Sequence, residues 1–186
     1  MRRCLELALQ AEGRTSPNPM VGSVVLDSSG QLVAEGHHRA PGEFHAERDA
    51  LATLDGPVPG GTLYVNLEPC CAWGRTPPCT DIILEKGISK VVVGMVDPDP
   101  RMQGQGLRLL RAEGVDVLVG VLGAECRELN AAYLMARCSN RPLVTLKAAM
   151  TLDGKISSAH GESKWITGEE ARLCGHRLRD RHDGIL

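Results

Sequence analysis

The 186-residue sequence predicts an α/β fold in which a mostly parallel sheet carries helices on its faces. Apolar runs of strand length alternate with segments of helical periodicity, and both kinds of segment end at Gly, Pro or other turn residues. Hydrophobic residues make up 42% of the chain and aromatic residues only 3%. We therefore expect a globular core built from Val, Leu, Ile, Ala and Met.

The opening elements are predicted to be a helix and a hairpin. Apolar residues recur at three- and four-residue spacing from Cys4 to Ala11, which indicates an amphipathic helix closed by Gly13. Strand-like runs at 21–26 and 32–36 flank the turn-rich sequence Asp-Ser-Ser-Gly-Gln, as in an antiparallel hairpin. This hairpin is expected to form the antiparallel edge of the sheet.

Helix and strand patterns then alternate along the chain. The predicted helices cover 45–54, 80–87, 106–114 and 124–138, and the predicted strands cover 62–67, 90–95 and 115–121. Alternation of this kind is typical of parallel strands whose connecting helices pack on the sheet.

A polar break at Ser-Asn-Arg-Pro-Leu, residues 139–143, divides the chain. We assign residues 1–142 to a first domain and residues 143–186 to the N-terminal part of a second, incomplete one. The second segment should open with a strand at 143–150 and continue with a helix at 167–181, for which Thr167 is the candidate N-cap. About 44 residues are too few for an independent core.

The charge pattern favours a small-molecule partner. The net charge is −2 with both signs interspersed, which argues against binding to nucleic acid or to a membrane surface. No apolar run approaches the roughly 18 residues that span a bilayer. Because Arg2 and Arg3 are followed by Glu6 within a helical pattern, a signal peptide is not expected, and the cytoplasm is the expected compartment. Whether the protein forms a homo-oligomer is left open.

Cysteine usage indicates a metal site rather than disulfides. The seven cysteines are Cys4, Cys70, Cys71, Cys79, Cys126, Cys138 and Cys174. Thiols persist in the cytosol, so a cluster of them is expected to bind metal or take part in catalysis, and a disulfide staple is the weaker alternative. Cys4, Cys126, Cys138 and Cys174 lie outside the cluster, and we expect them to be buried as small hydrophobic side chains.

The segment Asn-Leu-Glu-Pro-Cys-Cys-Ala-Trp-Gly-Arg-Thr-Pro-Pro-Cys-Thr, residues 66–80, supplies the clustered thiols. Together with His45 upstream, Cys70 and Cys79 would provide one imidazole and two thiolates to a single Zn²⁺. A catalytic zinc takes three protein ligands and keeps one position for water. Glu47, two residues after His45, would reach that water and shuttle protons, as in zinc deaminases.

Several alternatives remain open at this point. A lone histidine such as His45 is more often a helix cap or a surface group. Cys71 could be a fourth protein ligand, which would make the zinc structural. A non-catalytic, zinc-stabilised binding module would have no need of Glu47. A deaminase acting on another base, including one in nucleic acid, should show a basic face and aromatic stacking groups. The Gly-Gln-Gly sequence at 104–106, before a predicted helix, could bind phosphate.

The chain resembles the bifunctional riboflavin-biosynthesis deaminase/reductases along essentially its whole length. The shared motifs are SPNPMVGSVV (16–25), EGHHRAPGEFHAE (35–47), NLEPC (66–70), GRTPPCTD (74–81), DPDP (97–100), TLDGKI (151–156) and GESKWIT (161–167). Cytidine and tRNA-adenosine deaminases usually have Pro-Cys-x-x-Cys, whereas eight residues separate Cys70 from Cys79 here.

The resemblance implies a cytidine-deaminase-like fold, with a mixed sheet flanked by helices, and a first activity. This activity is the hydrolytic deamination of 2,5-diamino-6-ribosylamino-4(3H)-pyrimidinone 5′-phosphate. The resemblance also implies zinc ligation by His45, Cys70 and Cys79 and proton transfer by Glu47. Asn18 and His38 resemble substrate-binding positions. From the residues alone, Asn18 would be a turn residue, and His38 could be a solvated strand end.

The resemblance implies a second activity, NADPH-dependent reduction of the ribosyl group to ribityl, in a dihydrofolate-reductase-like α/β domain that begins at residue 143. Ala149 and Trp165 resemble contacts to NADPH, and Ser163 and Arg179 resemble contacts to the ribosyl phosphate. Lys147 is a further expected substrate contact. From the residues alone, Trp165 could equally be a core residue and Arg179 part of a solvated helix face.

Two positions depart from the family pattern. Ala72 stands where a substrate-contacting His is usual, and Asp99 stands where Asn is usual. The second change replaces an amide donor with a carboxylate near a phosphorylated substrate. Both departures bear on substrate affinity and leave the zinc chemistry unaffected.

Overall fold

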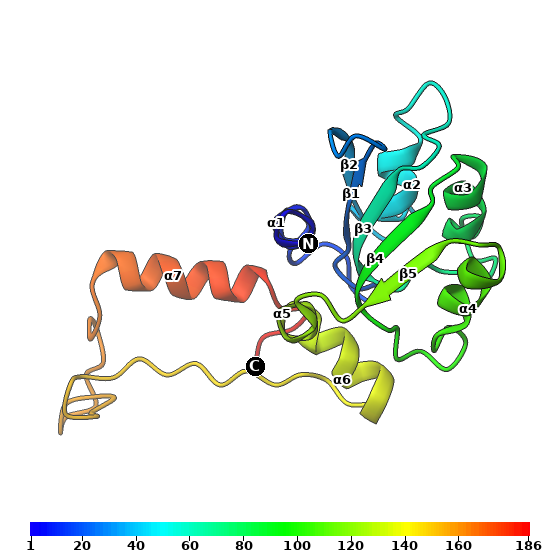
Figure 1. Cartoon of the computed structure of the whole chain (residues 1–186). Coiled ribbons are helices and arrows are strands. Elements are labelled where there is room, and N and C mark those ends of the chain that lie inside the picture. The colour runs from blue at the N-terminus through cyan, green and yellow to red at the C-terminus, as the bar shows by residue number, and fades with distance from the viewer. The chain divides into compact units, whose positions relative to one another are not determined.

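A mixed sheet of five strands organises the N-terminal part of the protein (Figure 1). The computed structural model describes residues 1–186, which divide into two units, Met1–Pro142 and Leu143–Leu186. The strands are β1 (Gly22–Leu26), β2 (Leu32–His37), β3 (Thr62–Leu67), β4 (Lys90–Met95) and β5 (Asp116–Val119). Their order is β2-β1-β3-β4-β5.

Strand directions agree with the expected edge hairpin. β1 pairs antiparallel with both β2 and β3, whereas β3, β4 and β5 run parallel. In the parallel part, helices connect successive strands, since a parallel pair needs a crossover connection. The predicted α/β class and its antiparallel edge are confirmed.

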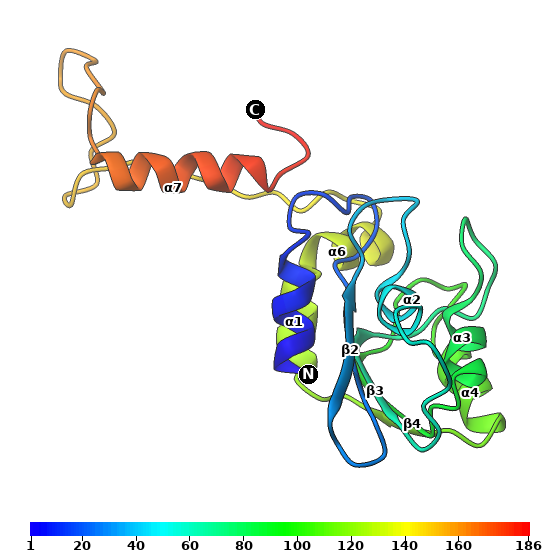
Figure 2. The same cartoon turned by 90° about the horizontal axis from the view of Figure 1, so that it is seen from above.

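Helices cover both faces of the sheet, as Figure 2 shows. One face carries α1 (Arg2–Leu9) and α5 (Gly123–Leu129), and the other carries α2 (Ala46–Leu51), α3 (Cys79–Glu85) and α4 (Gln105–Ala112). The main core is aliphatic, as its composition predicted, and centres on Leu63, Val65, Ile83, Val91 and Leu110. Burying each such side chain contributes roughly 1.5–3 kcal/mol, so the sheet is a firm support for the loops at its ends.

The predicted helix over 124–138 is in fact two helices, α5 and α6 (Ala131–Ser139). The break falls at Asn130, which is buried and lies outside helical geometry with φ −101° and ψ 24°. Its side chain accepts a hydrogen bond from the Met20 N–H (2.8 Å) and donates one to the Met20 carbonyl (3.0 Å). This pairing with a distant segment explains why helical periodicity alone did not reveal the break.

The second unit contains a single helix, α7 (Glu169–Asp180), and no strand. The strand expected at 143–150 is therefore wrong, because a strand needs a hydrogen-bonded neighbour and this unit provides none. Gly168, not Thr167, is the N-cap residue of α7. Apolar side chains such as Leu146 and Leu152 are exposed, and Gly175 is the one buried residue of the helix.

Two cysteines also differ from expectation. Cys4 and Cys126 are buried, as predicted, but Cys138 and Cys174 are exposed. Cys138 lies on α6, which has no buried residue, and Cys174 lies on α7, where only Gly175 is buried.

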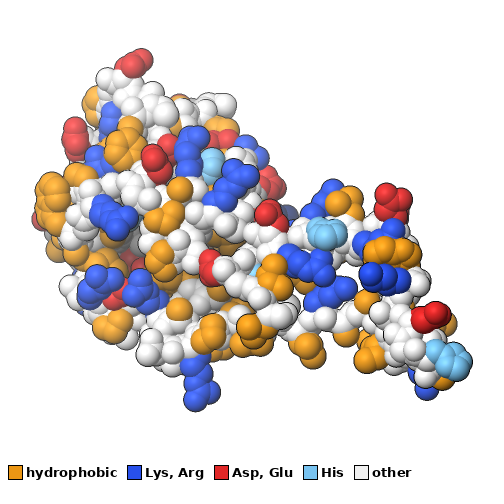
Figure 3. Space-filling view, turned by 180° about the vertical axis from the view of Figure 1, so that it is seen from behind, with side chains coloured by type: hydrophobic (Ala, Val, Ile, Leu, Met, Phe, Trp, Pro, Cys, Tyr) orange, Lys and Arg blue, Asp and Glu red, His pale blue; other side chains and the backbone are white.

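The length of the helices and the distribution of surface charge can be compared with what the sequence predicted. No helix has both the length and the apolar character required to cross a bilayer. Acidic and basic side chains are interspersed on the larger unit in Figure 3, as the charge pattern of the sequence predicted.

Candidate metal centre

The side chains of His45, Cys70 and Cys79 meet at one end of the sheet. His45 is the N-cap residue of α2, Cys70 follows β3 by three residues, and Cys79 is the first residue of α3. His45 Nδ1 lies 3.4 Å from Cys70 Sγ and 3.5 Å from Cys79 Sγ. All three donor atoms lie within 4.8 Å of one another. Three elements far apart in sequence thus place three soft donors around one point.

The donor set and its spacing fit Zn²⁺. Zinc–sulfur and zinc–nitrogen bonds of about 2.3 and 2.0 Å at a tetrahedral angle require donor separations of roughly 3.5 Å. The two measured nitrogen–sulfur separations have this value. Imidazole and thiolate ligands also favour zinc over harder cations, which prefer oxygen ligands.

Electrostatics at the cluster favours a bound cation. The pKa of Cys70 is lowered to about 4, first by its hydrogen bond with Cys79 and also by His45. The pKa of Cys79 is raised, because it shares that hydrogen bond and is fully buried. Cys70 is thus a thiolate that a cation would attract, and a divalent cation bound beside Cys79 would favour loss of the Cys79 proton as well.

Glu47 is buried beside the cluster without being one of its three donors. The residue is 3% exposed and lies in the first turn of α2. Burial raises the pKa of its carboxyl to about 7, and its neighbours include Cys70, His45 and Cys79, which hydrogen-bonds with it. The carboxyl therefore borders the space in front of the donors.

Asn18 and His38 form a fixed pair in the same region. His38 Nδ1 lies 2.9 Å from the Phe44 carbonyl oxygen, an acceptor, so Nδ1 carries the proton. His38 Nε2 then accepts from Asn18 Nδ2 at 3.0 Å. Burial lowers the pKa of His38, which favours this neutral form. His38 is buried rather than solvated, and the Asn18 amide is oriented by the imidazole.

A pocket of about 290 Å³ contains these groups. Its lining includes Asn18, His38, His45, Glu47, Glu68, Cys70, Ala72, Trp73, Arg75, Thr76, Asp97, Asp99, Arg101, Tyr133 and Arg137. Both departures from the family pattern, Ala72 and Asp99, thus lie on the pocket wall. At Ala72 the wall has a methyl group in place of an imidazole.

Cys71 stays outside the donor group. The cluster that could hold a metal comprises His45, Cys70 and Cys79, and Cys71 is half-buried beside it. Partial burial raises the pKa of the Cys71 thiol, which makes it a poorer ligand than its neighbour.

The Gly-Gln-Gly sequence does not present a vacant phosphate site. The backbone N–H groups of Gly104 and Gly106 donate to the two carboxylate oxygens of Glu68 at 2.8 and 3.0 Å. A Cβ at Gly106 would lie 2.1 Å from the Pro69 carbonyl oxygen, so the close approach requires glycine. The start of α4 thus binds an anion supplied by the chain itself.

Four pocket residues were not anticipated as a group: Glu68, Asp97, Tyr133 and Arg137. Asp97 accepts from the Tyr133 hydroxyl at 2.9 Å, and its own N–H donates to Glu68 at 3.1 Å. Tyr133 and Arg137 lie on α6, well after DPDP (97–100), the last of the shared family motifs in the first unit. No local sequence signal marks such a contribution, although a Tyr and an Arg four residues apart share one helix face.

The expected reductase residues all lie in the second unit. Lys147 and Arg179 lie beside Gly175, Trp165 is exposed beneath the guanidinium of Arg172, and Ala149 and Ser163 occupy segments without regular structure. No hydrogen bond or ion pair joins these five residues to one another. Trp165 is therefore not a core residue of this unit.

Comparison with known proteins agrees with this architecture. The family described as the cytidine and deoxycytidylate deaminase zinc-binding region matches residues 1–95, and the RibD C-terminal domain matches residues 142–186. Riboflavin biosynthesis protein RibD of Actinobacillus pleuropneumoniae is 47% identical over all 186 residues, which cover 49% of that protein. This chain belongs to the riboflavin-biosynthesis deaminase/reductase family. The corresponding RibD of Escherichia coli is 41% identical and is half covered (50%).

Solved structures of RibD relatives have the same fold. A deaminase/reductase from Thermotoga maritima is 44% identical with a TM-score of 0.91, over 96% of this chain and 51% of that one. The Rib2 deaminase of Aspergillus oryzae, solved in complex with DARIPP, is 25% identical with a TM-score of 0.56, over 73% of this chain and 90% of that one. The present chain spans about half the length of the curated RibD relatives it matches.

Proposed function

We propose that this chain catalyses the hydrolytic deamination of 2,5-diamino-6-ribosylamino-4(3H)-pyrimidinone 5′-phosphate, with release of ammonia. The observation that carries the proposal is the convergence of His45, Cys70 and Cys79 on one point, with His45, Cys70 and the buried Glu47 lining the adjoining pocket. Membership of the RibD family supports the choice of substrate.

The three donors would hold Zn²⁺ and leave the pocket side of the cluster open. When bound there, Zn²⁺ would supply Lewis-acid activation of water. Glu47 is not one of the three metal ligands, so an oxygen of its carboxylate can take a proton from the attacking water. The same group can then deliver that proton to the departing amino nitrogen, as a general acid–base catalyst.

Asn18 and His38 would orient the substrate in front of Glu47. Because Asn18 Nδ2 donates to His38 Nε2, its Oδ1 is held in one direction and can accept from an N–H or O–H of the substrate. The second nitrogen of His38 is fixed on the Phe44 carbonyl, so the pair is oriented before substrate binds. A fixed orientation lowers the entropic cost of reaching the reactive geometry.

The substrate assignment is tested by steady-state ammonia release. The zinc-loaded chain is assayed with the pyrimidine ribosyl phosphate, cytidine and adenosine at matched concentrations. We expect kcat/KM for the pyrimidine phosphate to exceed the other two by orders of magnitude. Comparable turnover of cytidine or adenosine would reassign the substrate, and the absence of ammonia from all three would favour a non-catalytic zinc-stabilised module.

We further propose that residues 143–186 contribute to a reductase site that uses NADPH to convert the ribosyl group to ribityl. Ala149 and Trp165 are assigned to NADPH, and Ser163, Arg179 and Lys147 to the substrate. The match of residues 142–186 to the RibD C-terminal domain supports this assignment.

The reductase proposal predicts that the two activities separate. A unit with one helix and no strand cannot form a cofactor cleft on its own. The 186-residue chain should therefore deaminate the pyrimidine without oxidising NADPH in the presence of the deaminated product. A chain extended through the rest of a RibD C-terminal domain should do both. Equal NADPH oxidation by the two chains would contradict the proposed domain assignment.

A further inference from the structure

The pocket has a positively charged rim. Three guanidinium groups line it, from Arg75, Arg101 and Arg137. Arg101 lies in the loop after β4, and Arg137 lies on α6. Their side chains are 74% and 38% exposed, whereas Glu47 is buried. The arginines therefore mark the solvent side of the pocket and Glu47 its interior.

Arg101 and Arg137 share one buried carboxylate, that of Asp99, whose side chain is 7% exposed. Arg101 donates two hydrogen bonds to this carboxylate, from Nε to Oδ1 at 3.0 Å and from Nη2 to Oδ2 at 2.6 Å. Arg137 Nη1 lies 3.8 Å from Oδ2, close enough for attraction but beyond a hydrogen bond. Two positive charges against one negative leave this group of three residues with a net charge of +1.

Arg137 is held in place by more than Asp99. Its guanidinium lies over the Tyr133 ring, 5.4 Å from the ring centre, and the Tyr133 hydroxyl donates to Asp97 at 2.9 Å. Asp97 is in turn bound by the N–H of Asp99 at 2.9 Å. No hydrogen bond of the structure uses the guanidinium N–H groups of Arg137, so they remain available to a ligand.

An anion with several acceptor oxygens is the ligand that suits this arrangement. Arginine forks bind phosphate and carboxylate through paired, charge-assisted hydrogen bonds. Arg101 has already committed one edge of its fork to Asp99, so its Nη1 group and the free donors of Arg137 are left for a second anion. A phosphomonoester offers three oxygens and close to two negative charges at neutral pH.

We propose that Arg101 and Arg137 bind the 5′-phosphate of the substrate and that Asp99 is a positioning residue that holds both guanidiniums toward it. This inference rests on the proposed deaminase function for the identity of the phosphate-bearing molecule. It also gives Asp99, the departure from the family's Asn, a role. A carboxylate can accept from both Nε and Nη2 of Arg101 with separate oxygens, whereas an Asn side chain offers one acceptor oxygen.

Kinetics with and without the phosphate test the two arginines. Arg101→Gln and Arg137→Gln are assayed with the pyrimidine ribosyl phosphate and with its dephosphorylated nucleoside. We expect each variant to raise KM for the phosphate about ten-fold or more, with kcat nearly unchanged and nucleoside kinetics unaltered. Arg2→Gln, a matched charge loss at an exposed position of α1, should leave both substrates unaffected.

Asp99 is tested by its coupling to Arg101. Asp99→Asn should raise KM for the phosphate by less than either arginine variant. The Asp99→Asn/Arg101→Gln double variant should be little worse than Arg101→Gln alone, because Asp99 acts through that arginine. Additive effects on the phosphate, or equal effects on the nucleoside, would show that Asp99 has only a structural role.

A binding measurement separates this inference from the deaminase proposal. Ribose 5-phosphate and ribose are titrated into the zinc-loaded chain by calorimetry, with circular dichroism confirming that each variant is folded. Wild-type preference for ribose 5-phosphate that is lost in Arg101→Gln and Arg137→Gln supports the rim as a phosphate site, even if no ammonia is released. Wild-type binding of ribose 5-phosphate no tighter than ribose, or unchanged binding in both variants, would overturn it, even if deamination is established.

Discussion

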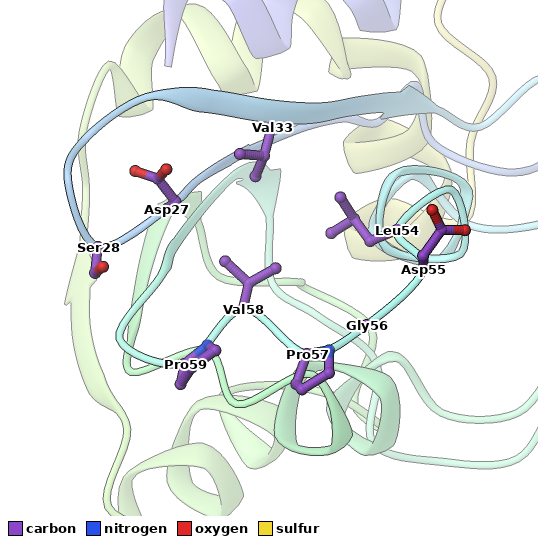
Figure 4. Close-up of a pocket in the computed structure, with 9 residues that line it drawn as sticks. All are labelled: Asp27, Ser28, Val33, Leu54, Asp55, Gly56, Pro57, Val58 and Pro59. Atoms are coloured by element: carbon purple, nitrogen blue, oxygen red, sulfur yellow. The ribbon is translucent and has the colours of Figure 1, made fainter.

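Two pockets of the first unit lie at opposite ends of β3, and of these two only one gathers reactive groups. The pocket in Figure 4 lies before β3, is lined by residues such as Asp27, Val33, Leu54 and Val58, and has a similar volume, about 360 Å³. The pocket after β3, at about 290 Å³, is lined by His45 and Cys70 of the candidate metal cluster and by Glu47. Volume therefore does not distinguish a site here.

The two pockets differ in what their polar groups do. In Figure 4 the carboxylates of Asp27 and Asp55 lie apart on either side of the pocket. Asp27 accepts hydrogen bonds from Ser29 and Gln31, so it stabilises the hairpin turn. After β3, by contrast, loops that follow β3 and β4 converge with the starts of α2 and α3. Such loops meet at the carboxyl ends of parallel strands. Of the two pockets, only the one after β3 has polar side chains from several loops lining a common cavity.

The largest expected effect is on the proton carrier of the site pocket. Glu47→Gln should keep zinc but lower turnover by about 10² to 10⁴, because an amide cannot accept the proton. Ammonia release and elemental zinc analysis check both halves of this prediction. Glu113→Gln, the same change at an exposed position after α4, is the control. Near-wild-type turnover in Glu47→Gln would remove Glu47 from the mechanism.

The next effect concerns which sulfurs hold the metal. Cys79→Ser should weaken zinc binding on the order of a hundred-fold or more, since one of three soft donors is replaced by a hydroxyl. Cys71→Ser should retain one zinc per chain, which competition with a chelator would measure. A comparable loss of zinc in both variants would indicate four protein ligands and a structural site.

A smaller effect is expected on the pH dependence of stability, through Asp99 at the rim of the site pocket. Arg101 lowers the pKa of Asp99 to about 2, against roughly 3.9 for an unfolded chain. Because the folded-state pKa is depressed, the stabilisation is complete above about pH 4 and is lost as the pH falls toward 2. Asp99→Asn should therefore reduce the free energy of unfolding at neutral pH by on the order of 1 kcal/mol, given partial solvent screening. The wild type and the variant should converge near pH 2.

Urea unfolding at several pH values would measure this difference. A constant gap between the wild type and Asp99→Asn from pH 7 to pH 2 would contradict the assigned ion pair. Asp27→Asn offers a comparison in the other pocket, where the pKa is lowered by the Ser29 hydrogen bond rather than by an arginine.

The smallest effect should come from the pocket before β3. Asp55→Asn is expected to leave kcat and KM for the pyrimidine phosphate within about two-fold of wild type, since surface changes away from a site are usually near neutral. Ammonia release measures it. A change of ten-fold or more would mean that the two ends of the sheet are functionally linked and that the contrast between them is wrong.

The sequence was sufficient for features that depend on nearby residues. The strands and most helices follow from periodicity, and the spacing of His45, Cys70 and Cys79 anticipated the three side chains that the structure brings together. Features set by distant partners were not predictable. The helix break at Asn130 depends on Met20, and the strand expected at 143–150 lacks a neighbour to pair with. In both cases the deciding atoms lie outside any local window of sequence.

The rim of the pocket illustrates the same limit within the site. The Asp99 position stood out as a departure from a motif, but its partner Arg137 comes from a helix whose sequence carries no motif of the deaminase. Only the folded chain places that guanidinium over Tyr133 and beside Asp99. A side chain that a distant helix brings to a pocket is thus harder to find from sequence than a cluster of His and Cys donors.

The hydrogen bonds of Glu68 at the start of α4 connect the candidate metal centre to a helix that supplies none of its three donors. The backbone of Gly104 and Gly106 fastens the carboxylate of a residue two positions before Cys70. The helix end thereby acts as an anchor for a ligand-bearing loop, and its affinity for anions is already satisfied from within. If the pocket binds an anionic substrate as proposed, these two N–H groups are already occupied, and the arginines at the rim are the donors left for it.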